Sequence, residues 1–255
     1  MTSCLRRFSD TRRDVASATT RGAGVLLIGT LLLFKPVAAQ DADTEGPVWS
    51  RLGLRHELPS AASLYGFAQL KDGIDYGYTQ WDFGLQLIRP ARRFTRANLF
   101  DVNPDQQHAF VFGAGYEYLE TTQSGTSKPQ NRLSIEGSFR NRPSKSFALS
   151  DRNRFEFRWI AGTYSTRYRN RLVAQLDLEA GSQRLSPYAS AEFFYTWGTT
   201  NSWNEARYSG GMTWQAPGSL ALSLFYLRQD CWTCHPVHVN ALGVDLTWFT
   251  GRSSR

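Results

Sequence analysis

Hydrophobic and polar side chains alternate with a period of two along most of the chain beyond residue 78. Successive side chains of a β-strand point to opposite faces, so this pattern predicts strands with one apolar and one polar face. No stretch of helical period and useful length interrupts the pattern, and we expect an all-β chain. The nine clearest segments have apolar faces that begin at Thr79, Phe110, Leu133, Phe155, Tyr168, Ala189, Ala206, Leu220 and Leu242.

Segments of about ten alternating residues, separated by turns, are typical of an antiparallel up-and-down transmembrane β-barrel. The rival fold is a soluble β-sandwich, but its dry core would not tolerate the closely spaced charges on the polar faces. Aromatic residues make up 14% of the chain, and they often begin or end the apolar faces, as a girdle at a membrane interface requires. These residues are Trp81, Trp159, Trp197, Trp214, Tyr226 and Trp248. We therefore predict the barrel.

The expected number of strands depends on two weaker runs, Val48–Leu58 and Leu64–Lys71, which raise the nine segments to eleven. Single-chain bacterial barrels have even strand numbers. Either the two weak runs form one distorted strand, giving ten, or a further strand lies within Pro90–Asp105, giving twelve. We expect ten or twelve strands, with twelve as the favoured number.

Residues 1–39 have the composition of a secretory signal peptide. Basic residues precede the apolar run Ala23–Phe34, which is too short to span a bilayer, and small residues lead to a cleavage point after Ala39. We expect residues 40–255 to form a single barrel domain in the bacterial outer membrane. The leader carries a net charge of +4 out of the +7 of the whole chain, so the basic composition does not indicate nucleic-acid binding.

A ladder of charged residues lies on the polar faces of neighbouring predicted strands, where arginine and glutamate can pair across strands. One interpretation is a network of ion pairs that closes a narrow barrel. The other is a lumen with excess arginine that passes or binds small anions. The ladder consists of Arg152, Arg154, Glu156, Arg158, Arg167, Arg169, Arg171, Glu192, Glu205 and Arg207.

The segment CWTCH at residues 231–235, followed by His238, matches the attachment signal for c-type haem. A zinc or copper site formed by Cys231, Cys234, His235 and His238 is a further alternative. We favour a disulfide between Cys231 and Cys234, because the chain reaches an oxidising compartment and Cys4 leaves with the leader. A bulky cofactor would also obstruct insertion of an unfolded chain, so we expect no cofactor.

Some outer-membrane lipid hydrolases carry a Ser–His–acid set on the outer surface of a barrel. None of the four histidines, His56, His108, His235 and His238, lies two residues before a serine. We therefore expect no catalytic residue and no enzyme activity, and a lipid hydrolase remains a third alternative.

Three segments resemble a family of outer-membrane proteins called domain of unknown function 2490. They are LSDRNRFEFRW at Leu149–Trp159, YRNRL at Tyr168–Leu172 and SPYASAEFF at Ser186–Phe194. The similarity covers roughly Pro47 to Phe249, and it implies an exported β-barrel without an established activity. Such barrels usually end on an aromatic residue that the insertion machinery reads, whereas here six residues follow Phe249. The resemblance therefore implies that Trp248 or Phe249 serves as this signal.

The expected function is that of a structural barrel or narrow, porin-like channel with a lumen lined by arginine and glutamate. A redox or metal-binding barrel that uses the Cys231–His238 loop is the alternative. We expect a monomer that contacts outer-membrane lipid, lipopolysaccharide and the barrel-insertion machinery.

Overall fold

The computed structural model describes residues 44–58, 62–73, 78–91, 108–180, 183–198, 200–216, 219–233 and 237–251. Within these ranges no helix is long and apolar enough to cross a membrane. The strands are β1 (Thr44–Glu45), β2 (Val48–Glu57), β3 (Ser63–Gly73), β4 (Tyr78–Pro90), β5 (His108–Gln123), β6 (Thr126–Asn141), β7 (Phe147–Ile160), β8 (Thr163–Leu176), β9 (Leu178–Ala180), β10 (Gln183–Trp197), β11 (Ser202–Gln215), β12 (Leu220–Cys231) and β13 (His238–Thr250).

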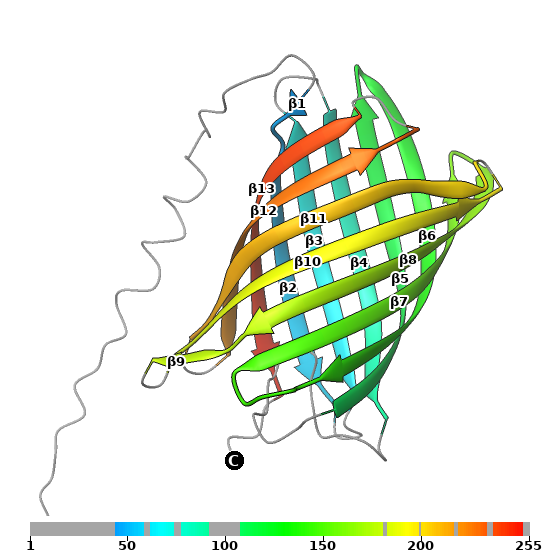
Figure 1. Ribbon diagram of the computed structural model, residues 1–255. Helices are drawn as coiled ribbons and strands as arrows, with labels where there is room; N and C mark the ends of the chain where they lie inside the picture. The colour runs from blue at the N-terminus through cyan, green and yellow to red at the C-terminus, as the bar shows by residue number, and fades with distance from the viewer. Residues whose placement is uncertain are drawn as a thin grey trace, which may run out of the picture. The chain divides into compact units, whose positions relative to one another are not determined.

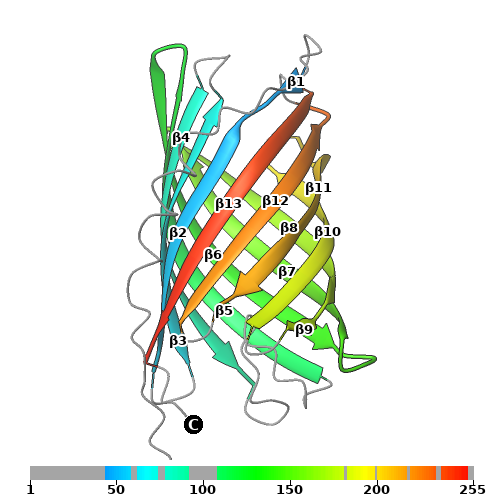
Figure 2. The ribbon, with the colours of Figure 1, turned by 90° about the vertical axis from the view of Figure 1, so that its left-hand side faces the viewer.

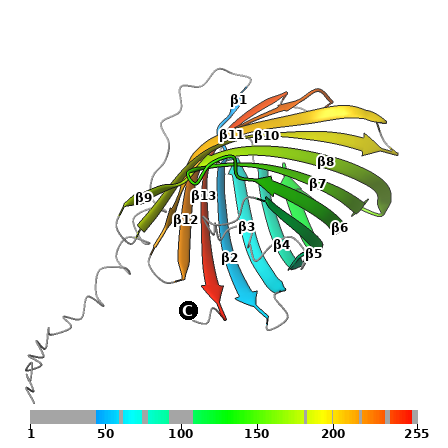
Figure 3. The ribbon, with the colours of Figure 1, turned by 60° about the horizontal axis from the view of Figure 1, so that its bottom comes forward.

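Consecutive long strands pair antiparallel, and the sheet closes on itself where β13 pairs with β2. Figure 1 shows the strands steeply inclined around the barrel, with β7, β8, β10 and β11 in front of β2, β3 and β4. In Figure 3 the same two groups form opposite walls. The prediction of an all-β, mainly antiparallel barrel is confirmed.

Eleven long strands form the closed ring, a number between the two values expected from the sequence. The runs Val48–Leu58 and Leu64–Lys71 correspond to two separate strands, β2 and β3, rather than one distorted strand. The twelfth strand was predicted within Pro90–Asp105. Pro90 ends β4, and from residue 92 onward this range lies outside the described residues. With antiparallel hairpins throughout, an odd number of strands makes the first and last strands parallel, and β2 and β13 do run parallel, side by side in Figure 2.

The short strands β1 and β9 prolong two strands of the ring. β1 pairs with β13 in the same register as β2, and Gly46 and Pro47 separate the two. β9 pairs with β10 in the same register as β8, and Asp177 interrupts the edge between them. The Asp177 carboxylate accepts hydrogen bonds from the side chains of Arg142, Gln175 and Ser186, so this interruption is fixed by polar contacts inside the barrel.

The distribution of side chains is the inverse of that in a water-soluble protein. Leu52 is 62% exposed and Phe112 is 59% exposed, and both belong to a largely apolar exterior. Inside, arginine, glutamate, glutamine and serine are buried. Strand parity sets this arrangement, because the apolar members of each alternating segment face outward and the polar members face the lumen.

The lumen has two unlike walls. On the wall formed by β2, β3, β4, β12 and β13, inward glycines of one strand make room for aromatic rings of the next. Phe67 of β3 lies over Gly84 of β4, and Phe225 of β12 lies over Gly243 of β13. The opposite wall, from β5 to β11, carries most of the inward charges. The aromatic wall narrows the space that the charged wall has to fill.

Candidate functional site: a charged layer in the lumen

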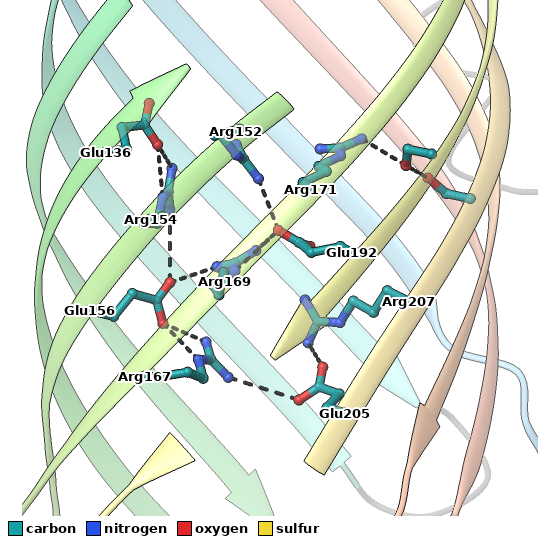
Figure 4. A network of polar contacts seen from close by, with 12 residues as sticks. Glu136, Arg152, Arg154, Glu156, Arg167, Arg169, Arg171, Glu192, Glu205 and Arg207 are labelled. Carbon is teal, nitrogen blue, oxygen red and sulfur yellow. Dashed lines mark hydrogen bonds and ion pairs between the residues drawn. The ribbon is translucent and has the colours of Figure 1, made fainter. Parts of the chain in front are cut away.

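Every member of the arginine and glutamate ladder predicted from the sequence faces the lumen, on β7, β8, β10 or β11. Cross-strand register brings these residues together, since Glu156 lies opposite Arg167, and Glu192 lies opposite both Arg171 and Arg207. Figure 4 labels nine of the ten, all except Arg158, and shows their charged groups gathered inside the barrel. The polar parity of neighbouring strands therefore produces one contiguous site.

Glu156 is the centre of the network and has no exposed surface. Its carboxylate is 2.7 Å from nitrogens of both Arg167 and Arg169. Arg132 and Arg154 approach it at 3.6 and 4.0 Å. Four guanidinium groups thus surround one buried carboxylate, which stabilises its charge far from water.

Two further carboxylates extend the network towards β11. Glu192 accepts from Arg152 at 3.0 Å and from Arg169 at 2.9 Å. Glu205 lies 2.6 Å from Arg207 and 3.9 Å from Arg167. Arg167 and Arg169 therefore each connect Glu156 to a second carboxylate (Figure 4).

The inward Phe194 ring is fully buried among three of these arginines. The guanidinium carbons of Arg167, Arg169 and Arg207 lie 5.0, 4.9 and 4.7 Å from its centroid, within the range of cation–π attraction. Arg207 also lies 5.3 Å from the centroid of Trp49, on β2. β11 and β2 are not neighbours, so this contact links the charged wall to the aromatic wall across the lumen.

Sequence reasoning missed three members of the network, Glu117 on β5 and Arg132 and Glu136 on β6. Glu117 pairs with Arg132 at 2.7 Å and with Arg154 at 3.2 Å, and Glu136 pairs with Arg154 at 2.7 Å. All three stand on the polar parity of their strands, which was the available signal. Together with the predicted ladder they form what we call the charged layer.

The charged layer has more positive than negative groups. Eight arginines face five glutamates: Arg132, Arg152, Arg154, Arg158, Arg167, Arg169, Arg171 and Arg207 against Glu117, Glu136, Glu156, Glu192 and Glu205. Arg171 donates to the Ser190 hydroxyl at 3.3 Å. Among the described residues, no carboxylate forms an ion pair with Arg158, which is buried. A surplus of fixed positive charge favours anions over cations.

Comparison with known proteins identifies the family. Residues 93–234 match the family model described as "Protein of unknown function (DUF2490)". The chain belongs to this family. The match runs through the whole charged layer, from Glu117 to Arg207, and no curated protein matches the sequence.

In this DUF2490 protein the predicted cysteine loop joins β12 to β13 at the end of the barrel that carries the β5–β6 turn. Cys231 is buried and disulfide-bonded, and its backbone N–H donates to the carbonyl of Val237 at 2.7 Å. Cys234 and His235 lie outside the described residues. In the described part of the chain, no three His, Cys, Asp or Glu side chains are grouped as metal ligands.

His238 and His56 lie at opposite ends of the barrel of this family member. The His238 Nδ1 atom is 2.7 Å from a carboxylate oxygen of Asp230, which also accepts from Arg228. The His56 Nδ1 atom is 3.0 Å from the Thr250 hydroxyl. Neither histidine belongs to the charged layer.

Proposed function

We propose that this protein is an exported outer-membrane β-barrel. Its apolar exterior supports the proposal, because leaving so many large hydrophobic side chains in water is unfavourable by about 25 cal/mol for each Å². Aromatic residues bound this exterior at both ends of the barrel. Trp81 and Trp159 lie near the end that carries the β5–β6 turn, and Trp214 and Trp248 lie near the opposite end. Such girdles suit the two interfaces of a bilayer.

We propose further that the charged layer closes the lumen to solutes and leaves at most a narrow path for small anions. The observation that carries this proposal is the complete burial of Glu156 among four arginines in the lumen. In an eleven-stranded barrel, side chains of this size fill most of the interior. The surplus of arginine gives any residual path its preference for anions.

Ion conductance in planar bilayers tests this function. We expect the wild-type barrel to pass little current, and Glu156→Gln to raise the current several-fold with selectivity for chloride over potassium. Loss of the central carboxylate leaves four guanidinium groups without their common partner, so they separate and attract anions. The reversal potential in a chloride gradient reports the selectivity.

The matched control is Glu120→Gln, which makes the same chemical change in an exposed side chain beside the β5–β6 turn. We expect its current to equal that of the wild type, with the fold of each variant checked by its heat-dependent mobility in gels. A large, unselective wild-type current would contradict a closed lumen. Equal currents in the two variants would contradict the role of Glu156.

The proposal includes no cofactor and no enzyme activity. For the loop between β12 and β13 we propose that Cys231 pairs with Cys234, because a sulfur already bonded to another sulfur cannot form the thioether that attaches haem. The N–H of Trp232 donates to the carbonyl of Asn204 at 3.0 Å, so the loop is also tied to β11. A local disulfide would pin this loop at the end of the barrel.

A further inference from the structure

A group of polar side chains interrupts the apolar exterior on β7 and β8. Asp151 and Asn153 alternate with the inward Arg152 and Arg154, so they face outward. Asn170 lies directly opposite Asn153, and Tyr168 lies two residues away from it on the same face of β8. We call the group Asp151, Asn153, Tyr168 and Asn170 the polar notch.

Hydrogen bonds hold the polar notch together. Asn170 donates from Nδ2 to a carboxylate oxygen of Asp151 at 2.6 Å and to Oδ1 of Asn153 at 3.1 Å. Asn153 donates to the second carboxylate oxygen of Asp151 at 3.1 Å, and the Tyr168 hydroxyl donates to Asn153. Both oxygens of the carboxylate therefore face neutral amide donors, and neither amide can neutralise the charge.

The described residues on the outward faces of β7 and β8 include no Lys, Arg or His. Leu149, Phe155 and Leu172 on the same outward face are all exposed and apolar. Among the described residues, no Lys, Arg or His side chain forms an ion pair with Asp151. An ionised carboxylate on the outer wall of a membrane barrel is unfavourable without a partner, and a cationic lipid headgroup would supply one.

A groove adjoins the polar notch. Its volume is about 450 Å³, and Tyr168, Asn170, Phe193 and Trp203 line it. Asn170 and Tyr168 therefore belong both to the notch and to the wall of the groove. Trp203 and Tyr168 pack edge to face, with ring centroids 6.2 Å apart, so this wall of the groove is aromatic.

We propose that the notch and groove bind one phospholipid that carries a primary ammonium headgroup, of the phosphatidylethanolamine class. The ammonium donates to the Asp151 carboxylate, and the aromatic groove takes part of an acyl chain. The absence of basic residues around the notch, within the described residues, argues against an anionic headgroup. This inference rests on the proposed membrane location, and it is independent of whether the lumen conducts.

Lipid retention by the inserted protein tests the inference. The protein is refolded into vesicles of phosphatidylethanolamine and phosphatidylglycerol in equal amounts, and the lipids that stay bound after mild detergent extraction are identified by native mass spectrometry. We expect wild type to retain the ethanolamine lipid with a preference of roughly fivefold, or about 1 kcal/mol. In Asp151→Asn we expect the preference to fall to none, because the amide has no charge.

The matched control is Asp72→Asn, which changes another outward carboxylate, at the end of β3, hydrogen-bonded to Thr79. We expect it to keep the preference. A wild type that prefers phosphatidylglycerol, shows no preference or emerges as a dimer joined through this face would overturn the inference. Flotation of the vesicles tests the membrane location separately from the lipid site. A protein that does not float with the vesicles has failed to insert, which contradicts the membrane location before any lipid preference is measured.

Discussion

Single inward glycines decide how closely the aromatic wall packs. A Cβ atom on Gly243 would lie 1.9 Å from Cζ of Phe225, and one on Gly84 would lie 2.3 Å from the Phe67 ring. Each ring lies against the glycine of the neighbouring strand and covers backbone that has no side chain of its own. This packing is specific to the positions where a ring and a glycine meet.

We expect Gly243→Ala to lower the free energy of unfolding by about 1–3 kcal/mol, because the new methyl group forces the Phe225 ring to move. The measurement is urea unfolding of the refolded barrel in lipid vesicles. Gly137→Ala is the control, since its Cβ would lie 3.8 Å from the Phe112 ring, an ordinary van der Waals distance. An equal decrease in the free energy of unfolding in both variants would contradict the packing argument. Adding Phe225→Leu to Gly243→Ala should restore part of that free energy, because the smaller side chain leaves room for the methyl group.

Among the elements, β2 and β13 are the pair that closes the barrel. Their parallel register places Ser50 beside Val244 and Leu54 beside Trp248. This pairing joins segments almost two hundred residues apart, whereas every other pair of neighbouring long strands that the structure describes is consecutive along the chain. Its parallel direction follows from the odd number of strands, each antiparallel to the next.

A disulfide across this pair tests the closure. In a chain whose native cysteines are replaced by serine, we expect Ser50→Cys with Val244→Cys to cross-link under mild oxidation, because paired strands lie about 4.8 Å apart. Ser50→Cys with Trp248→Cys should stay reduced, since four residues separate the two positions by about 13 Å along the strand. Gel mobility without reductant distinguishes the two products. Cross-linking of the second pair instead would mean a different register or strand number.

For the molecule as a whole, the proposed membrane location accounts for the apolar exterior, and the predicted leader gives the route by which the chain would reach it. In the barrel, the charged layer is buried and many large hydrophobic side chains are exposed. In the proposed location, the apolar exterior would be buried against lipid, in addition to small internal clusters such as Trp49, Leu227 and Ala241. The proposed disulfide between Cys231 and Cys234 requires an oxidising compartment, and the proposed export would deliver the chain to one.

The intact mass of the chain from the membrane fraction tests export and the loop together. We expect a chain that starts at Gln40 and is two hydrogens lighter before reduction than after it. Cys231→Ser serves as the control and should have the expected mass without a shift on reduction. A chain that keeps residues 1–39 would contradict export, and a mass increased by one haem would overturn the proposed disulfide.

The alternation of side chains along each segment determined the strands, their outward and inward faces and the family resemblance. It also predicted the inward position of Arg152, Arg154 and Glu156, because parity is a local property of a strand. The closure by β2 and β13 and the strand number depended on the register between distant segments. The same holds for Glu117, which joins Arg154 only because β5, β6 and β7 bring their charges to one level. Parity also separates Asp151 from Arg152 and Arg154. Only the tertiary structure placed Asn170 beside Asp151, because that contact depends on the register between β7 and β8.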